Sequence, residues 1–276
     1  MKGGIIWRTV LLILLAVILC CPVAPAFGEE NDNDEDDEND YSGWTRFEQP
    51  SGGTYKEPRM QYWVYTPEDM EPGLPLVIYL HSSFGLVGKA LRDAMPVMIR
   101  DGRMPKPDCV VLVPQLTGNY NNPHQWEEVF GSLIPIIEKV VKEYEVDETR
   151  IALTGYSLGG IGVFDLAVAD RGRYAKIMSV CGKCHYPVLD AVDAFAGTEV
   201  LVLTAQYDTT VNSATAVTFA GMLQEAGITA YHEELPYTHG ELPFAVYTQK
   251  EVQEWLWLIP SISEKPADET GEEPAN

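Results

Sequence analysis

The chain has 276 residues, and 46% of them are hydrophobic, which is enough for one sizeable globular domain with a single core. The formal net charge is −22, and the Lys and Arg residues form no cluster. Because contacts to phosphate backbones need clustered basic residues, we expect no nucleic-acid partner.

The N-terminal segment has the pattern of a signal peptide. Lys2 and Arg8 precede ten apolar residues from Val10 to Leu19, and small residues such as Ala26 follow. A ten-residue helix is about 15 Å long, half of the roughly 30 Å hydrocarbon core of a bilayer. We therefore predict a cleaved leader at 1–28 and a secreted or extracytoplasmic protein. The alternative is a membrane-anchored form, held only through an uncleaved or lipidated leader.

Two other segments have the composition of disordered chain. Residues 29–40 hold nine acidic residues and no basic one, and this segment lacks the glycine and spaced glutamate of a calcium-binding loop. We predict an acidic disordered linker there, a folded domain at 41–260, and a disordered acidic tail at 261–276.

Short apolar runs alternate with stretches of helical periodicity along the folded domain. The predicted strands are 44–48, 60–66, 74–80, 109–114, 151–153, 176–181, 199–205 and 230–235, and helices are expected at 132–144, at 159–169 and near 255–259. The first two strands suggest an antiparallel edge. The alternation predicts a single α/β domain, with a mostly parallel, doubly wound sheet and helices on both faces.

The most informative stretch is Arg-Ile-Ala-Leu-Thr-Gly-Tyr-Ser-Leu-Gly-Gly at 150–160, which contains a G-x-S-x-G motif around Ser157. A serine on a sharp strand-to-helix turn takes a strained backbone conformation that exposes its oxygen. The glycines two residues to either side keep strand and helix from colliding. The motif predicts a nucleophile, and the alternative is a tight turn that carries an idle serine.

A serine nucleophile needs a base to take its proton and an acid to orient that base. Asp208 and His239 each follow a predicted strand closely, at 199–205 and 230–235, so both are expected at the carboxyl edge of the sheet. We predict that His239 is the base and Asp208 the acid. For Asp208 the alternative is a turn-forming aspartate.

Four segments resemble the α/β-hydrolase superfamily: 76–81, 146–160, 204–211 and 238–240. More narrowly, they resemble its small secreted esterases of the phospholipase/carboxylesterase, dienelactone-hydrolase-like and feruloyl-esterase or polyhydroxybutyrate-depolymerase-like group. The resemblance extends over residues 60 to 258. It implies an ester-cleaving serine hydrolase that needs no cofactor.

One position departs from this resemblance. The resembled esterases usually have glycine after the histidine that ends the third strand, whereas Ser82 follows His81 here. The resemblance implies an oxyanion hole formed by the backbone N–H groups of Leu158 and Ser83. Losing one such donor lowers the rate about 10²–10³-fold, so Ser82 puts turnover in doubt unless a Ser82 or Ser83 hydroxyl donates instead.

Four aromatic residues are expected near the catalytic edge, where they would line an apolar or aromatic acyl pocket: Phe84, Tyr120, Trp126 and Tyr156. For Trp126 and Tyr156, packing in the core is the alternative. No long insertion follows the predicted strand at 176–181, so we expect an open cleft without a large lid. Such a cleft favours small or surface-accessible esters, including those on polysaccharides.

Three cysteines remain after the predicted cleavage: Cys109, Cys181 and Cys184. Cys181 and Cys184 have redox or zinc spacing, but no second pair of ligands is evident, so we predict no metal site. A local disulfide between them and buried thiols are the two alternatives.

Taken together, these patterns predict a secreted carboxylic-ester hydrolase in which Ser157 attacks, His239 transfers the proton and Asp208 orients His239. Two alternatives remain. A prolyl-oligopeptidase-like serine peptidase would use the same triad, but such enzymes usually carry a propeller domain, for which the chain has no room. A non-catalytic surface or binding protein could have kept the α/β-hydrolase fold, and the departure at Ser82 is its best argument.

Overall fold

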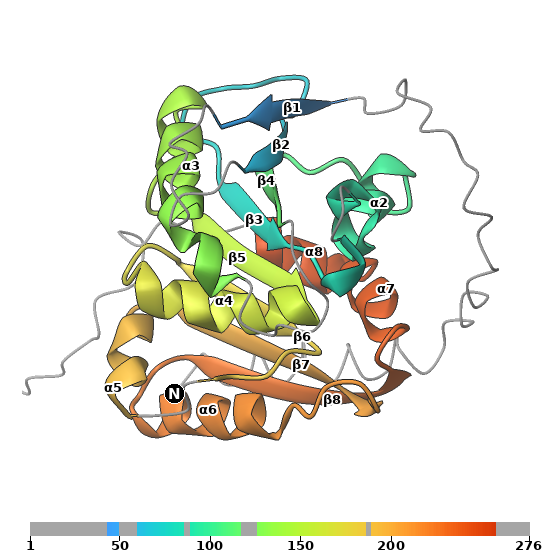
Figure 1. Cartoon of the computed structure of the whole chain (residues 1–276), viewed down its shortest axis with the longest axis vertical. Coiled ribbons are helices and arrows are strands. Elements are labelled where there is room, and N and C mark those ends of the chain that lie inside the picture. The colour runs from blue at the N-terminus through green and yellow to red at the C-terminus, as the bar shows by residue number, and fades with distance from the viewer. Residues whose placement is uncertain (1–42, 50–59, 86–88, 117–125, 186–188, 258–276) are drawn as a thin grey trace, which may run out of the picture.

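The computed structural model describes residues 43–49, 60–85, 89–116, 126–185 and 189–257. They form one eight-stranded sheet with helices on both faces (Figure 1). The predicted signal peptide, acidic linker and acidic tail lie outside the described residues, so the proposed domain limits stay predictions. Within the described residues, no helix combines the length and apolar character needed to cross a membrane.

The strands are β1 (Trp44–Glu48), β2 (Gln61–Tyr65), β3 (Leu76–Leu80), β4 (Val110–Gln115), β5 (Ile151–Tyr156), β6 (Lys176–Val180), β7 (Glu199–Tyr207) and β8 (Ala230–Thr238). Their spatial order is β1-β2-β4-β3-β5-β6-β7-β8. β1 and β2 pair antiparallel, β2 pairs antiparallel with β4, and every other pair is parallel. The predicted mostly parallel sheet with an antiparallel edge is confirmed.

The α-helices are α2 (Ala94–Arg100), α3 (Phe130–Glu143), α4 (Leu158–Ala169), α5 (Leu189–Val192), α6 (Ala214–Glu225), α7 (Leu242–Tyr247) and α8 (Lys250–Trp257). Short 3₁₀ turns are η1 (Ser83–Gly85), η2 (Ala90–Arg92), η3 (Glu127–Val129) and η4 (Asp193–Phe195). In Figure 1, α3, α4 and α6 cover one face of the sheet, whereas α2, α7 and α8 lie on the other.

Two hydrophobic clusters fill the space between the sheet and these helix layers. Leu76, Ile78 and Leu80 of β3 join the cluster under α3, α4 and α6, while Val77 and Tyr79 join the opposite cluster. Alternate side chains of a strand point to opposite faces, and both faces of β3 are covered. This is why the central strands read in the sequence as unbroken apolar runs.

The order of the strands places the site. From β3 the chain moves to β4 on one side, and it then returns to β5 on the other side of β3. This reversal is a topological switch point, and ligands of open parallel sheets bind beyond the carboxyl ends of the strands at such a point. The loop after β3 and the turn after β5 meet there, and they carry the predicted oxyanion residue Ser83 and the predicted nucleophile Ser157.

Candidate active site

Ser157 occupies the single residue between β5 and α4, with φ of 55° and ψ of −113°. Positive φ is strained for a residue with a side chain, and such strain must be held by neighbouring structure. The Ser157 N–H donates to the Val180 carbonyl at 2.9 Å, and the Ser157 carbonyl accepts from the Ile161 N–H at 3.0 Å. The predicted strand-turn-helix arrangement is therefore present, and both peptide groups of the turn are tied down.

The glycines around Ser157 have a steric role. A Cβ atom on Gly159 would lie 1.8 Å from the Leu80 carbonyl oxygen, and one on Gly155 would lie 2.5 Å from the Gly159 backbone. Both distances are far inside van der Waals contact. The spacing of the G-x-S-x-G motif thus follows from how closely α4 approaches β3 and β5.

The three residues predicted as a triad form one hydrogen-bonded chain. Ser157 Oγ lies 2.9 Å from His239 Nε2, and His239 Nδ1 lies 2.7 Å from Asp208 Oδ2. A carboxylate can only accept, so Nδ1 carries the imidazole proton and Nε2 is free to accept the serine proton. The side chains come from the ends of β5, β7 and β8, which adjoin the same edge of the sheet.

Asp208 is both a turn former and the partner of the histidine. Its Oδ1 accepts the N–H groups of Thr210 at 2.8 Å and Val211 at 2.9 Å, while Oδ2 faces His239. Burial alone would raise the pKa of this carboxyl, but the hydrogen bonds from His239, Val211 and Thr210 outweigh it and lower the pKa below its ordinary value. Asp208 is therefore ionised at neutral pH.

The His239 backbone is held from two sides. The Tyr156 hydroxyl donates to the His239 carbonyl at 3.1 Å, and the Cys181 thiol lies 3.8 Å from the same oxygen. Burial raises the pKa of the Cys181 thiol, so it is a neutral donor. The sequence predicted Tyr156 in an acyl pocket, with core packing as the alternative, and it left a Cys181–Cys184 disulfide and buried thiols as the two alternatives for the cysteines. In the structure Tyr156 and Cys181 both contact the His239 carbonyl, and Cys109, Cys181 and Cys184 are buried thiols that form no disulfide with one another.

The two predicted oxyanion donors face no competing acceptor. Leu158 is the first residue of α4 and Ser83 is the first residue of η1. The first N–H groups of a helix have no partner within that helix. Within the described residues, neither N–H donates a hydrogen bond. The Ser82 hydroxyl donates to Asp93 Oδ1 at 2.8 Å, so its hydrogen is committed to a buried carboxylate. The alternative of a Ser82 hydroxyl in the oxyanion hole does not fit this geometry.

No protein-family model and no curated protein matches the sequence, but solved structures match the fold. A thermostable esterase superposes with a TM-score of 0.65 at 24% identity, over 79% of this chain and 63% of its own, so the chain spans less than two thirds of that protein. A ferulic acid esterase from Anaeromyces mucronatus gives 0.58 at 16% identity, over 76% and 89%. An arylesterase gives 0.57 at 13% identity, over 90% and 89%.

The chain has the α/β-hydrolase fold. The segments that resemble this superfamily lie where an α/β-hydrolase needs them, because β3, β5, β7 and β8 each lead into a loop at the carboxyl edge of the sheet.

The aromatic residues predicted to line a pocket do not lie together. Phe84 follows Ser83 directly and is 49% exposed, whereas Trp126 is 1% exposed and packs against Gly162 and His81 in the core. Tyr120 lies outside the described residues. Tyr207, which precedes Asp208, is 57% exposed and was not predicted. It is the last residue of β7 and directly precedes the acid, and that position was the available signal.

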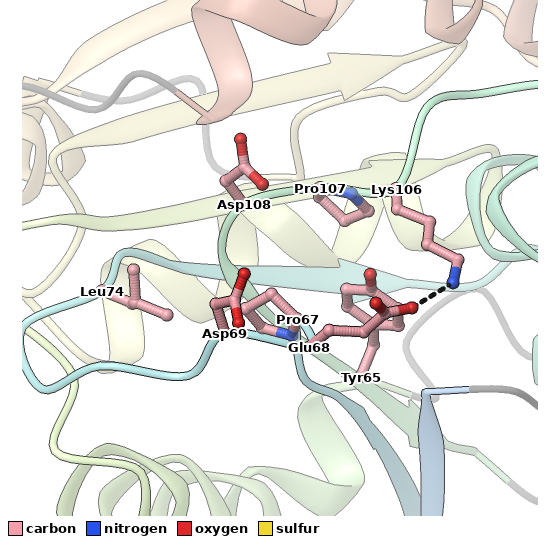
Figure 2. Close-up of a pocket in the computed structure, with 8 residues that line it drawn as sticks. All are labelled: Tyr65, Pro67, Glu68, Asp69, Leu74, Lys106, Pro107 and Asp108. Carbon is pink, nitrogen blue, oxygen red and sulfur yellow. Dashed lines mark hydrogen bonds and ion pairs between the residues drawn. The ribbon is translucent and has the colours of Figure 1, made fainter.

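A surface hollow of about 380 Å³ lies away from the triad. Figure 2 shows its lining residues: Tyr65, Pro67, Glu68, Asp69, Leu74, Lys106, Pro107 and Asp108. Leu74 and Asp108 precede β3 and β4, so the hollow borders the amino ends of these strands, opposite the carboxyl edge that carries Ser157. Its ion pair, Lys106 with Glu68 at 3.0 Å, is exposed. Ligands of open parallel sheets bind at the carboxyl ends of the strands, so this hollow lies at the edge opposite the expected site.

Two groups of described side chains bring metal-ligand atoms within 4.8 Å of one another. One is Cys181, Asp208 and His239, in which Asp208 and His239 bind each other in the triad and the Cys181 thiol contacts the His239 carbonyl. The other is Glu127, Asp165 and His185, beside α4, where His185 Nδ1 lies 3.0 Å from Asp165 Oδ2. Burial raises the pKa of Asp165 to about 8, with a smaller contribution from the charge of Glu127. Because burial makes Asp165 harder to ionise in the folded state, we expect this group to affect the free energy of unfolding.

Proposed function

We propose that the protein is a serine esterase that cleaves carboxylic esters through an acyl-enzyme. The observation that carries the proposal is the chain Ser157–His239–Asp208, hydrogen-bonded at 2.9 and 2.7 Å on a strained turn at the switch point of the sheet. The similarity of the fold to solved esterases supports it.

The arrangement supplies each step of acyl transfer. Ser157 Oγ attacks the ester carbonyl while His239 Nε2 takes its proton, and Asp208 stabilises the imidazolium that forms. The oxyanion is met by the N–H groups of Leu158 and Ser83. When the intermediate collapses, the alcohol leaves with the proton from His239. Water, deprotonated by His239, then attacks the acyl-enzyme, releases the acid and returns the proton to Ser157.

The surroundings of the nucleophile support a proposal for the substrate class. Between β6, which ends at Val180, and α5, which begins at Leu189, the chain has no room for a large lid domain. Phe84 and Tyr207 are exposed beside the oxyanion loop and the acid. We place small esters and esters on polysaccharide surfaces first, and the leader pattern at 1–28 adds export from the cytoplasm to the proposal.

Hydrolysis of p-nitrophenyl acetate and butyrate by the purified protein tests the proposal. The wild type should turn over both esters, and Ser157→Ala should fall to the background rate. Ser213→Ala is the matched control, because the Ser213 hydroxyl has no hydrogen-bond partner among the described residues. Wild-type protein as inert as Ser157→Ala would refute the esterase. Cleavage of prolyl peptides in place of esters would favour the peptidase.

A further inference from the structure

The loop that follows β3 leaves one backbone N–H open among four in succession. The Ser82 N–H donates to Asp93 Oδ2 at 2.7 Å, the Phe84 N–H to Ser82 Oγ at 3.1 Å, and the Gly85 N–H to the Ser82 carbonyl at 3.0 Å. The Ser83 N–H has no acceptor among the residues that the structure describes. The N–H groups of Ser82, Phe84 and Gly85 therefore shape the loop, and the Ser83 N–H is available to a ligand.

The direction of the Ser83 N–H is set by the Ser82 carbonyl, because the two belong to one planar peptide group and point in opposite directions. That carbonyl accepts from the Gly85 N–H and from His81 Nδ1, which lies 2.7 Å away. Two donors on one oxygen hold the peptide plane against rotation. The Ser83 N–H lies in the same plane and is consequently held pointing away from the two donors that bind the carbonyl.

The protonation of His81 suits this task. Its Nε2 accepts the Leu116 N–H at 2.9 Å, so the single imidazole proton lies on Nδ1 and faces the Ser82 carbonyl. Burial lowers the pKa of His81 to about 4. The imidazole is therefore neutral at physiological pH, and this tautomer is maintained.

Asp93 ties the same loop to the start of α2. This carboxylate is 3% exposed, and its Oδ2 accepts the Tyr79 hydroxyl at 2.8 Å as well as the Ser82 N–H. Its Oδ1 accepts the Ser82 hydroxyl. Ser82 is thus bonded to one carboxylate through both its main chain and its side chain. These two hydrogen bonds hold Ser82 itself in place, and Ser82 is the residue from which the Ser82–Ser83 peptide group extends.

We propose that Ser82 and Asp93 are positioning residues that aim the Ser83 N–H at the oxyanion. At the position where the resembled esterases have glycine, this chain uses a buried hydroxyl and a buried carboxylate to hold the loop. The inference rests on the proposed esterase function and deepens it. It predicts that the two residues act on the transition state more than on substrate binding.

Kinetics of three variants with p-nitrophenyl butyrate test this role. Ser82→Ala removes a tie to Asp93 and the acceptor of the Phe84 N–H, so kcat should fall roughly 10- to 100-fold, short of the 10²–10³ for a lost donor, with KM within about twofold. Asp93→Ala should lower kcat further than Ser82→Ala does. Asp93→Asn should restore most of the activity, since its amide oxygen can accept from Tyr79 and the Ser82 N–H.

A trifluoromethyl ketone provides the second readout, because it forms a tetrahedral adduct that needs the oxyanion hole. Its inhibition constant should rise across the variants in proportion to the loss of kcat/KM. Thr198→Val is the matched control. It removes a buried hydroxyl that donates to the Tyr174 carbonyl at 2.7 Å, at the opposite edge of the sheet, and it should leave kcat unchanged.

The outcomes separate the two proposals. Wild-type turnover with unchanged kcat in Ser82→Ala and Asp93→Ala would overturn the positioning role and leave the esterase standing. An equal loss of kcat in Thr198→Val would overturn it too, since the effect would then be general destabilisation. If Asp93→Ala does not fold, Ser82→Ala decides. Wild-type protein without turnover would overturn the esterase, and this inference with it.

Discussion

Each residue of the triad is held by the main chain as well as by its neighbour in the triad. The Ser157 N–H is bonded to Val180, the His239 carbonyl accepts from Tyr156, and Asp208 Oδ1 accepts two backbone N–H groups. Catalytic groups need positions fixed to a fraction of an ångström, and such secondary contacts provide that.

Asp208→Asn should lower kcat by roughly 10³–10⁴ at neutral pH. The two N–H groups at Oδ1 will hold the amide oxygen there, so the amide nitrogen must face His239 Nδ1. Nδ1 would then have to accept, the proton would move to Nε2, and the base could no longer take the serine proton. Steady-state rates at pH 7 measure this. A loss smaller than tenfold would contradict the assigned tautomer.

Tyr156→Phe should have a milder effect. It removes the 3.1 Å hydrogen bond to the His239 carbonyl, worth about 1 kcal/mol, so kcat should drop roughly fivefold. Tyr62→Phe is the control, because the hydroxyl of Tyr62 in β2 accepts from Lys139 of α3, away from the site. Equal activity of Tyr156→Phe and the wild type would show that this contact does not position the base.

At the scale of secondary structure, the site depends on how closely α4 packs on β3 and β5. Gly159→Ala should destabilise the fold by about 3 kcal/mol and abolish activity, because its Cβ would overlap the Leu80 carbonyl. Gly221→Ala in α6 is the matched opposite. Nothing lies within 4 Å of its Cβ position, and replacing a helical glycine stabilises by up to about 1 kcal/mol. Thermal unfolding should give a lower Tm for Gly159→Ala and a higher Tm for Gly221→Ala. A shift of both Tm values in the same direction would contradict this packing.

The strands and the order of the triad could be predicted because they leave local signals in the sequence. Strands buried on both faces appear as continuous apolar runs, and Asp208 and His239 follow two of them closely. The ends of β7 and β8 were missed, since Tyr207 and Thr238 pair through the backbone beyond a register shift at Gln206, while their side chains are exposed.

Contacts between distant positions left no such signal. Asp93 contacts Ser82 from eleven positions further along the sequence, with no periodicity to indicate the contact. Trp126 was expected in a pocket because it was predicted to lie on a loop at the catalytic edge, with packing in the core as the alternative. It lies in the core because Gly162 of α4 has no side chain and leaves room for the indole. Both facts depend on how helices pack in three dimensions, which local patterns do not report.

At the scale of the whole molecule, the pH dependence of the free energy of unfolding should reflect Asp165, a buried acid in α4. The pKa of Asp165 is about 8 when folded, against 3.8 for the ordinary group, so ionising it costs stability in the folded state. The folded state therefore favours the neutral carboxyl, and stability is not reduced by Asp165 below about pH 4. The free energy of unfolding then falls as pH rises from 4 toward 8. Asp165→Asn should remove this dependence and raise stability at pH 8 by on the order of a few kcal/mol.

Denaturant unfolding at pH 5 and pH 8 measures this difference. The variant should lose less stability than the wild type between the two values, since its amide oxygen can still accept from His185 Nδ1, which lies 3.0 Å from Asp165 Oδ2 in the wild type. A variant whose stability falls with pH as steeply as that of the wild type would show that Asp165 is not the group responsible.

The most direct test of the central claim is covalent labelling of the whole protein with a fluorophosphonate, followed by digestion and mass spectrometry. We predict one label, on Ser157, which disappears in Ser157→Ala, forms far more slowly in His239→Ala, and is unchanged in Ser213→Ala. Such a result would show that the hydrogen-bonded chain activates this serine. Wild-type protein that takes no label, or takes it on another residue, would contradict the account.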